Sequence, residues 1–146
     1  MDVNVTLEWK GAMGFDAEID GHTIRLDADN KVGGNNTGPS PKKLLLVALG
    51  GCTGMDIVSL LKKMRVDVEK FTVNVDSFQT EDEHPFVYDH YKITFLFDGN
   101  ELEKRQDKIV KAVILSQERY CGVSAMLSKS APITYEIRVN GQTIEQ

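Results

Sequence analysis

Hydrophobic and polar residues alternate with a period of two in the first part of the chain. This pattern is typical of β-strands that bury one face. In the first strand, four apolar residues share one face: Val3, Val5, Leu7 and Trp9. We expect a second strand over residues 13–19 and a third over residues 22–28, joined by a hairpin turn at Asp20-Gly21.

A loop and a long helix are predicted next. Residues 30–40 are rich in Gly and Asn, which indicates a flexible loop. Ser40-Pro41 is typical of a helix start, and a helix is predicted over residues 41–64. Residues 44–49 are apolar on nearly every face, so we expect protein to surround them. The uncharged run ends at Met55 and is too short for a membrane span, so the pattern favours a buried helix.

The second half of the chain predicts strands that gather in hairpins rather than alternate strictly with helices. Its expected elements are strands over residues 71–76 and 90–97, a helix over 101–119, a short helix over 123–128 and a strand over 133–139. In the longer helix, the expected inner face consists of Leu102, Gln106, Ile109 and Val113. This order predicts an α+β fold instead of a doubly wound parallel sheet.

The length, net charge and cysteine content of the chain argue against several classes of function. A chain of 146 residues fits one domain, here residues 1–146. The net charge of −5 argues against a mainly electrostatic grip on nucleic acid or an anionic membrane. The N-terminus lacks the basic start and apolar stretch of a secretory signal. Two cysteines in such a chain suggest a reducing cytoplasm, where they are free thiols or a redox pair.

The two cysteines lie in different contexts. Cys52 stands among Gly50, Gly51 and Gly54, and each glycine costs a helix about 1 kcal/mol relative to alanine. Something therefore has to approach this helix closely, either another helix or a ligand of the thiol. The plainer interpretation is a small buried hydrophobe. Cys121 precedes a short helix, where backbone N–H groups would stabilise its thiolate.

Other catalytic or metal-binding patterns are weak. Cys52, Cys121, His84 and His90 lack the paired close spacing of structural zinc sites, so no metal is expected. The glycines of the loop lack the lysine that completes a phosphate-binding loop, and no dinucleotide fingerprint is present. The acidic run over residues 81–83 is interpreted as a solvated turn.

Two motifs resemble those of the OsmC/Ohr family. The first is Gly38-Pro39-Ser40-Pro41, which opens an apolar helix that reaches Cys52. The second runs from Glu118 to Ser124 around Cys121 and precedes a short helix and the last strand. The resemblance covers nearly the whole chain, including the order of the strands.

The resemblance implies a fold, a partner and a reaction. Members of the family are typically cytoplasmic homodimers, in which two chains intertwine and antiparallel sheets wrap around long central helices. Well-studied members are peroxidases that reduce organic hydroperoxides in oxidative stress defence, with no metal, flavin or other cofactor. Carried over to this chain, Cys52 is the peroxidatic thiol and Cys121 the resolving thiol. An external dithiol reductant then restores the pair.

Two positions depart from the hydroperoxide-resistance members. Those members carry a glutamate after the proline that opens the helix, and here that position is Lys42. They also carry an arginine near the first hairpin, whereas the first arginine of this chain is Arg25. The chain therefore resembles a divergent branch that lacks the activating Arg–Glu pair. Lys42 and Arg119 are the cations that we consider as substitutes.

Two other functions stay open at this stage. The fold could have lost peroxidase activity and bind a small apolar ligand, or the cysteines could perform other thiol chemistry such as disulfide exchange. An apolar site at an interface would favour lipid-like or aromatic hydroperoxides over hydrogen peroxide, because a nonpolar group gains burial.

Overall fold

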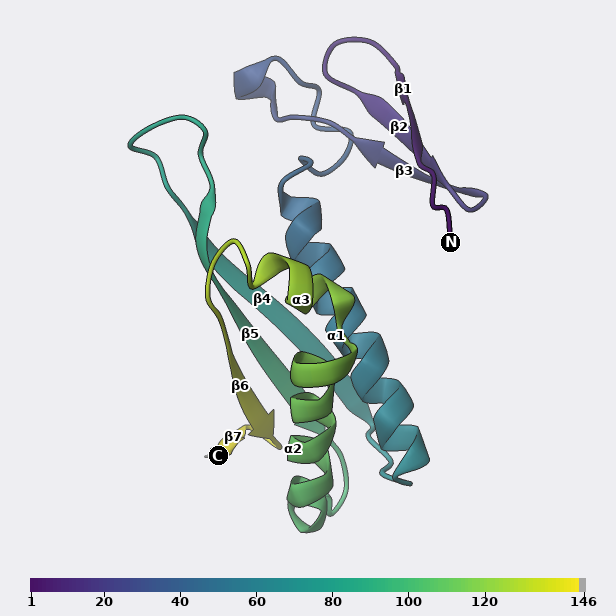
Figure 1. The fold of residues 1–146 in the computed structure, drawn as a ribbon, viewed down its shortest axis with the longest axis vertical. Coiled ribbons are helices and arrows are strands. Elements are labelled where there is room, and N and C mark those ends of the chain that lie inside the picture. Colours follow the sequence, from purple (N-terminus) through teal and green to yellow (C-terminus); the bar gives the residue numbers. More distant parts are fainter. Residues whose placement is uncertain (145–146) are drawn as a thin grey trace. The chain divides into compact units, whose positions relative to one another are not determined.

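The chain consists of two compact units, residues 1–45 and the part that begins at Leu46 (Figure 1). The structure, a computed structural model, describes residues 1–144. Helix α1 (Lys43–Lys63) begins at the end of the first unit and runs through the second. The single domain over residues 1–146 that the sequence suggests stays a prediction.

The first unit contains the three strands that the alternating pattern predicts. They are β1 (Thr6–Trp9), β2 (Phe15–Ile19) and β3 (His22–Leu26), joined as an antiparallel sheet in that order. The hairpin at Asp20-Gly21 is confirmed, because both residues adopt the positive φ angles of a tight turn. Each strand is shorter than the sequence indicates.

The predicted loop after β3 is tied to that strand by the buried carboxylate of Asp27. Its Oδ2 accepts hydrogen bonds from the Thr37 amide at 3.1 Å and the Thr37 hydroxyl at 2.5 Å. Its Oδ1 accepts one from the Ala28 amide at 2.7 Å. The loop also contains a short 3-10 helix, η1 (Asn30–Val32). A loop was expected here, but its backbone is held by specific hydrogen bonds.

The second unit contains a four-stranded sheet with two helices against it. Its strands are β4 (Lys70–Gln79), β5 (Tyr88–Asp98), β6 (Ile133–Val139) and β7 (Gln142–Ile144), in the order β4-β5-β6-β7. The β4–β5 and β6–β7 pairs are antiparallel, whereas β5 and β6 are parallel. The parallel pair is possible because helices connect these two strands and carry the chain back. The α+β fold class is confirmed.

The region predicted as one helix over residues 101–119 is divided into three segments. They are the 3-10 helix η2 (Leu102–Arg105), α2 (Gln106–Leu115) and the π-helix η3 (Ser116–Tyr120). The short helix α3 (Gly122–Leu127) follows Cys121, as predicted.

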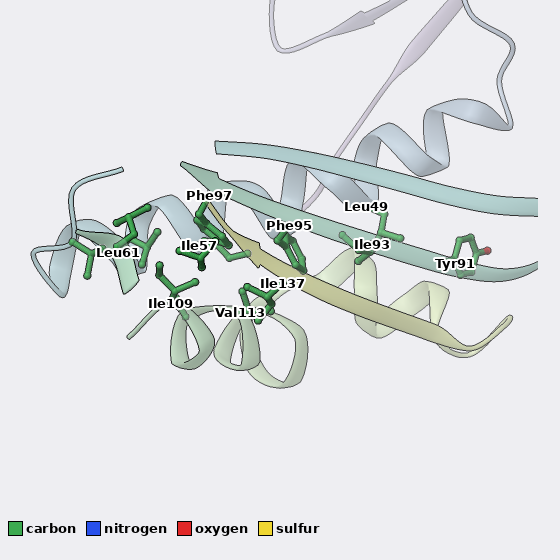
Figure 2. Packing of buried hydrophobic residues seen from close by; sticks show 14 of the residues in the cluster. Leu49, Ile57, Leu61, Tyr91, Ile93, Phe95, Phe97, Ile109, Val113 and Ile137 are labelled. Carbon is green, nitrogen blue, oxygen red and sulfur yellow. The ribbon is translucent and has the colours of Figure 1, made fainter. Parts of the chain in front are cut away.

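The core of the second unit lies between helices α1 and α2 and one face of the sheet (Figure 2). Alternate residues of β5 supply its centre. Residues of the paired strand β6 lie beside them, and both helices cover them. Fully buried members include Leu49, Ile57, Ile93, Phe95, Phe97, Ile109, Val113 and Ile137. The predicted inner residues Leu102, Ile109 and Val113 are buried, and Gln106 is half-buried.

Helix α1 approaches β4 closely through its glycines. A Cβ atom at Gly50 would lie 3.1 Å from Cγ2 of Val75, and one at Gly54 would lie 3.4 Å from Cγ2 of Val73. A strand, and not the second helix that the sequence suggested, therefore makes the close approach to these glycines. Beside these glycines one face of α1 is open, and Met55 is 76% exposed there.

In length and composition, α1 would suffice to cross a membrane, and it is alone in this among the helices of residues 1–144. Its inner side nevertheless belongs to the core of the second unit, through Leu49, Ile57 and Leu61. Helices that supply core residues can be as long and as apolar as helices that cross a membrane.

Candidate active site

Cys52 lies on α1, on the half-buried side of the helix. The next turn of the same face carries Asp56, because residues four apart are neighbours on a helix. Thr53 beside it is fully buried, and its hydroxyl donates to the carbonyl of Leu49 at 3.0 Å. Cys52 is thus fixed on a rigid element and not on a loop.

Cys121 is buried at the junction between η3 and α3. Its backbone is extended, and its amide donates to the Ser116 carbonyl at 2.8 Å. Its Sγ accepts a hydrogen bond from the amide of Ser124 at 3.3 Å, so the sulfur caps α3. The preceding π-helical turn sets this position, and such turns are frequent at functional sites.

The fold brings the two thiols together. The Sγ atoms of Cys52 and Cys121 and a carboxylate oxygen of Asp56 all lie within 4.8 Å of one another. Both cysteines are free thiols, so the pair is close but not bonded. Thiols this close can form a disulfide once the two sulfur atoms approach to the bond length of about 2.05 Å.

Asp56 was not anticipated from the sequence. It is half-buried, and its Oδ2 accepts a hydrogen bond at 3.1 Å from the fully buried hydroxyl of Ser116. Within residues 1–144, no ion pair to Asp56 is found. The four-residue spacing from Cys52 was the signal that would have placed this carboxylate beside the thiol.

The surroundings of Cys52 oppose its ionisation. Burial raises the pKa of the Cys52 thiol above its ordinary value, and the neighbouring Cys121 and Asp56 add to the rise. A hydrogen bond from the Val123 amide acts in the other direction and lowers that pKa. The net effect is that the thiol form of Cys52 is favoured.

The two candidate substitute cations, Lys42 and Arg119, and the first arginine of the chain, Arg25, lie in different places. Arg119 is exposed, and its guanidinium carbon lies 5.5 Å from the centre of the Tyr120 ring. Arg25 belongs to the first unit, where it forms an ion pair with Asp16 at 2.5 Å. Lys42 also belongs to the first unit, at the residue before α1 begins. The roles of Lys42 and Arg119 toward Cys52 stay predictions.

The histidines considered as zinc ligands are not part of this cluster. His84 lies in the loop between β4 and β5, where its ring stacks on Phe86 at 4.0 Å. His90 lies on β5 and pairs with Asp89 at 2.6 Å. The site therefore consists of two thiols and one carboxylate.

Comparisons with known proteins agree on one family. Residues 33–136 match the family model described as OsmC-like protein. The chain is 34% identical to protein YhfA of Escherichia coli K12, over 91% of this chain and 95% of YhfA.

Solved structures show the same fold. A hypothetical protein from Aquifex aeolicus is 29% identical, with a TM-score of 0.76 over 95% of this chain and 98% of that one. An organic hydroperoxide resistance protein OsmC from Legionella pneumophila is 12% identical, with a TM-score of 0.67 over 95% and 98% of the two chains. The extent of these matches, together with the paired thiols, leads to one conclusion: this chain belongs to the OsmC-like protein family.

Proposed function

We propose that this protein is a thiol-dependent peroxidase that reduces organic hydroperoxides, with Cys52 as the peroxidatic and Cys121 as the resolving residue. One observation carries the proposal: α1 and the η3–α3 junction bring two free thiols within 4.8 Å. The name of the Legionella pneumophila relative, an organic hydroperoxide resistance protein, supports the choice of substrate.

The proposed reaction consumes one hydroperoxide and two thiols. The Cys52 thiolate attacks the distal oxygen of the hydroperoxide, the O–O bond breaks, and the leaving alkoxide takes a proton to give an alcohol. Cys52 is then a sulfenic acid. The Cys121 sulfur attacks the Cys52 sulfur, the hydroxyl leaves as water with one proton, and a disulfide forms. An external dithiol reduces this disulfide.

Backbone amides support these steps. The hydrogen bond from the Val123 amide favours the attacking thiolate of Cys52. The amide of Ser124 holds the Cys121 sulfur at 3.3 Å while it waits for the sulfenic acid. Both amides belong to α3, so this short helix orients the two sulfurs for their reaction.

We further propose that two copies of the chain form a homodimer through the open face of α1. This face carries three large apolar side chains that are exposed in one chain: Val47, Met55 and Val58. A row of such residues on one helix marks an interaction surface. A second copy would bury this row of side chains.

The test follows the thiols directly. The reduced protein receives one equivalent of cumene hydroperoxide, and free thiols and intact mass are recorded with time. We expect both thiols to disappear and the mass to fall by that of two hydrogens. Cys52→Ser should abolish the reaction, and Cys121→Ser should stop at the sulfenic acid. Two thiols that stay unchanged over many minutes would contradict the proposal.

A second candidate function is the binding of a small apolar ligand without peroxidase activity. The groove beside α1 favours it, because Gly50, Gly51, Met55, Phe71 and Val73 line a largely apolar hollow. Either a second copy of the chain or a small apolar ligand would cover this hollow. Native mass spectrometry distinguishes them, since a second copy doubles the mass and a co-purified ligand adds a small increment. Initial rates with cumene hydroperoxide and hydrogen peroxide then test the preference for apolar substrates.

A further inference from the structure

Cys52, Cys121 and Asp56 bring three metal-binding groups to one point of the second unit. Their ligand atoms lie within 4.8 Å of one another, and no other such group occurs within residues 1–144. We propose that the reduced protein binds one thiophilic divalent cation of the Zn²⁺ class at these three residues. The proposal needs free thiols but does not depend on peroxidase activity.

The donor set fits Zn²⁺ in kind and in distance. Thiolate sulfur binds Zn²⁺ at about 2.3 Å and carboxylate oxygen at about 2.0–2.2 Å. Neighbouring ligand atoms of a tetrahedral site are therefore about 3.3–3.8 Å apart. The three atoms here are at most 4.8 Å apart, so a contraction of about 1 Å completes the arrangement. Mg²⁺ and Ca²⁺ prefer oxygen ligands and are not expected to compete.

The carboxylate is already oriented. The Ser116 hydroxyl donates to Oδ2 of Asp56 at 3.1 Å and so orients the carboxylate that lies beside the two thiols. Hydrogen bonds of this kind to ligating carboxylates orient them and raise metal affinity. Helix α1 fixes the spacing of Asp56 and Cys52, and the η3–α3 junction fixes Cys121.

Charge also favours a cation. Two ionised thiols and one carboxylate would place three negative charges together, and Asp56 forms no ion pair within residues 1–144. A divalent cation offsets most of this charge, while the thiol protons pass to the solvent on binding. The bound cation thus supplies the positive charge that the described part of the chain does not place beside these three groups.

Three protein ligands leave one position of the tetrahedron for water. Sites of this kind keep an exchangeable position, unlike structural zinc sites with four protein ligands. We infer that the bound cation holds both thiols in the reduced form and excludes a hydroperoxide from Cys52. Formation of a Cys52–Cys121 disulfide would in turn remove two of the three ligands and release the cation.

The experiment measures Zn²⁺ affinity by competition with a chromogenic chelator on the reduced full chain. We expect one Zn²⁺ per chain and none on protein whose thiols are blocked with N-ethylmaleimide. Asp56→Asn should weaken binding at least tenfold, whereas the matched control Asp67→Asn, at an exposed carboxylate, should leave it unchanged. Cys52→Ser and Cys121→Ser should each weaken it further.

Cobalt provides a readout that needs no variant. Co²⁺ added to the unmodified reduced protein should give the near-ultraviolet bands of thiolate-to-metal charge transfer, together with visible bands of tetrahedral coordination. Absence of these bands, or an Asp56→Asn variant with full Zn²⁺ affinity, would overturn the proposal. Zn²⁺ binding by a protein that does not react with cumene hydroperoxide would refute the peroxidase and leave this inference standing.

Discussion

Ser116 and Asp56 belong to different helical segments and are joined by a hydrogen bond of 3.1 Å from the serine hydroxyl to Oδ2 of the carboxylate. Ser116 is fully buried, and it is also the residue whose carbonyl accepts the amide of Cys121. One residue thus connects both sides of the thiol site. The relationship ties the orientation of Asp56 to the turn that places Cys121.

The first prediction concerns Ser116→Ala. The variant removes the donor to Asp56 and leaves the buried side of that carboxylate without a partner, so we expect it to destabilise the protein by about 1–2 kcal/mol. Denaturant unfolding monitored by circular dichroism measures the change. Ser128→Ala is the matched control, because its exposed hydroxyl bonds only within its own helix end. Equal stability of the two variants would show that the Ser116–Asp56 bond contributes nothing.

The second prediction concerns pH and Asp27. Hydrogen bonds from the Thr37 hydroxyl and from the amides of Ala28 and Thr37 lower the pKa of Asp27 from 3.8 to about 2. The folded state therefore binds a proton less readily than the unfolded state. The ionised Asp27 carboxylate therefore stabilises the folded state fully above about pH 4, and this stabilisation is lost as the pH falls toward about 2.

Trp9 makes this effect measurable, because it is the single tryptophan of the chain and lies in the first unit. Asp27→Asn should lower the midpoint of thermal unfolding recorded by tryptophan fluorescence at neutral pH. It should also flatten the loss of stability between about pH 4 and pH 2. Asp20→Asn, in an exposed hairpin turn, is the control. A profile of Asp27→Asn as steep as that of the unchanged protein would contradict the assignment.

Much of the fold follows from the sequence because periodicity reports which face of an element is buried. The alternation around Ile93 and Phe95 predicts β5, and the spacing of Ile109 and Val113 predicts the inner side of α2. The hairpin between β6 and β7 was missed, since the three residues of β7 are too few to show a period. The parallel pairing of β5 with β6 is a long-range contact that local pattern does not encode.

Less of the candidate site than of the fold could be predicted from the sequence. Spacing alone does not place Cys52 next to Cys121, and the resemblance to the OsmC/Ohr family supplied that pairing. The π-helical turn before Cys121 was not anticipated, because the sequence pattern predicts one continuous helix over residues 101–119. Asp56 could have been found, since it lies one helical turn after Cys52.

The third prediction concerns Gly34. A Cβ atom at this buried position would overlap the backbone carbonyl of Ala28, and a backbone carbonyl cannot move aside as a side chain can. Gly34→Ala should therefore destabilise the first unit by about 3 kcal/mol or more. Asn35→Ala, at the exposed next position, should change stability by no more than about 0.5 kcal/mol. Denaturant unfolding followed by Trp9 fluorescence compares the two, and similar midpoints would show that the loop shifts without cost.

The last prediction concerns the open face of α1. Met55 is 76% exposed in one chain, and Met and Lys have similar helix propensities, so Met55→Lys should leave the fold of a single chain intact. In the proposed homodimer the same change buries an unpaired charge, which costs far more than the lost apolar contact. We expect light scattering after gel filtration to show a dimer for the unchanged protein and a monomer for Met55→Lys, with circular dichroism unchanged. Ser128→Lys adds the same charge at an exposed helix end and should remain dimeric. A Met55→Lys protein that stays dimeric would place the contact between copies on another surface.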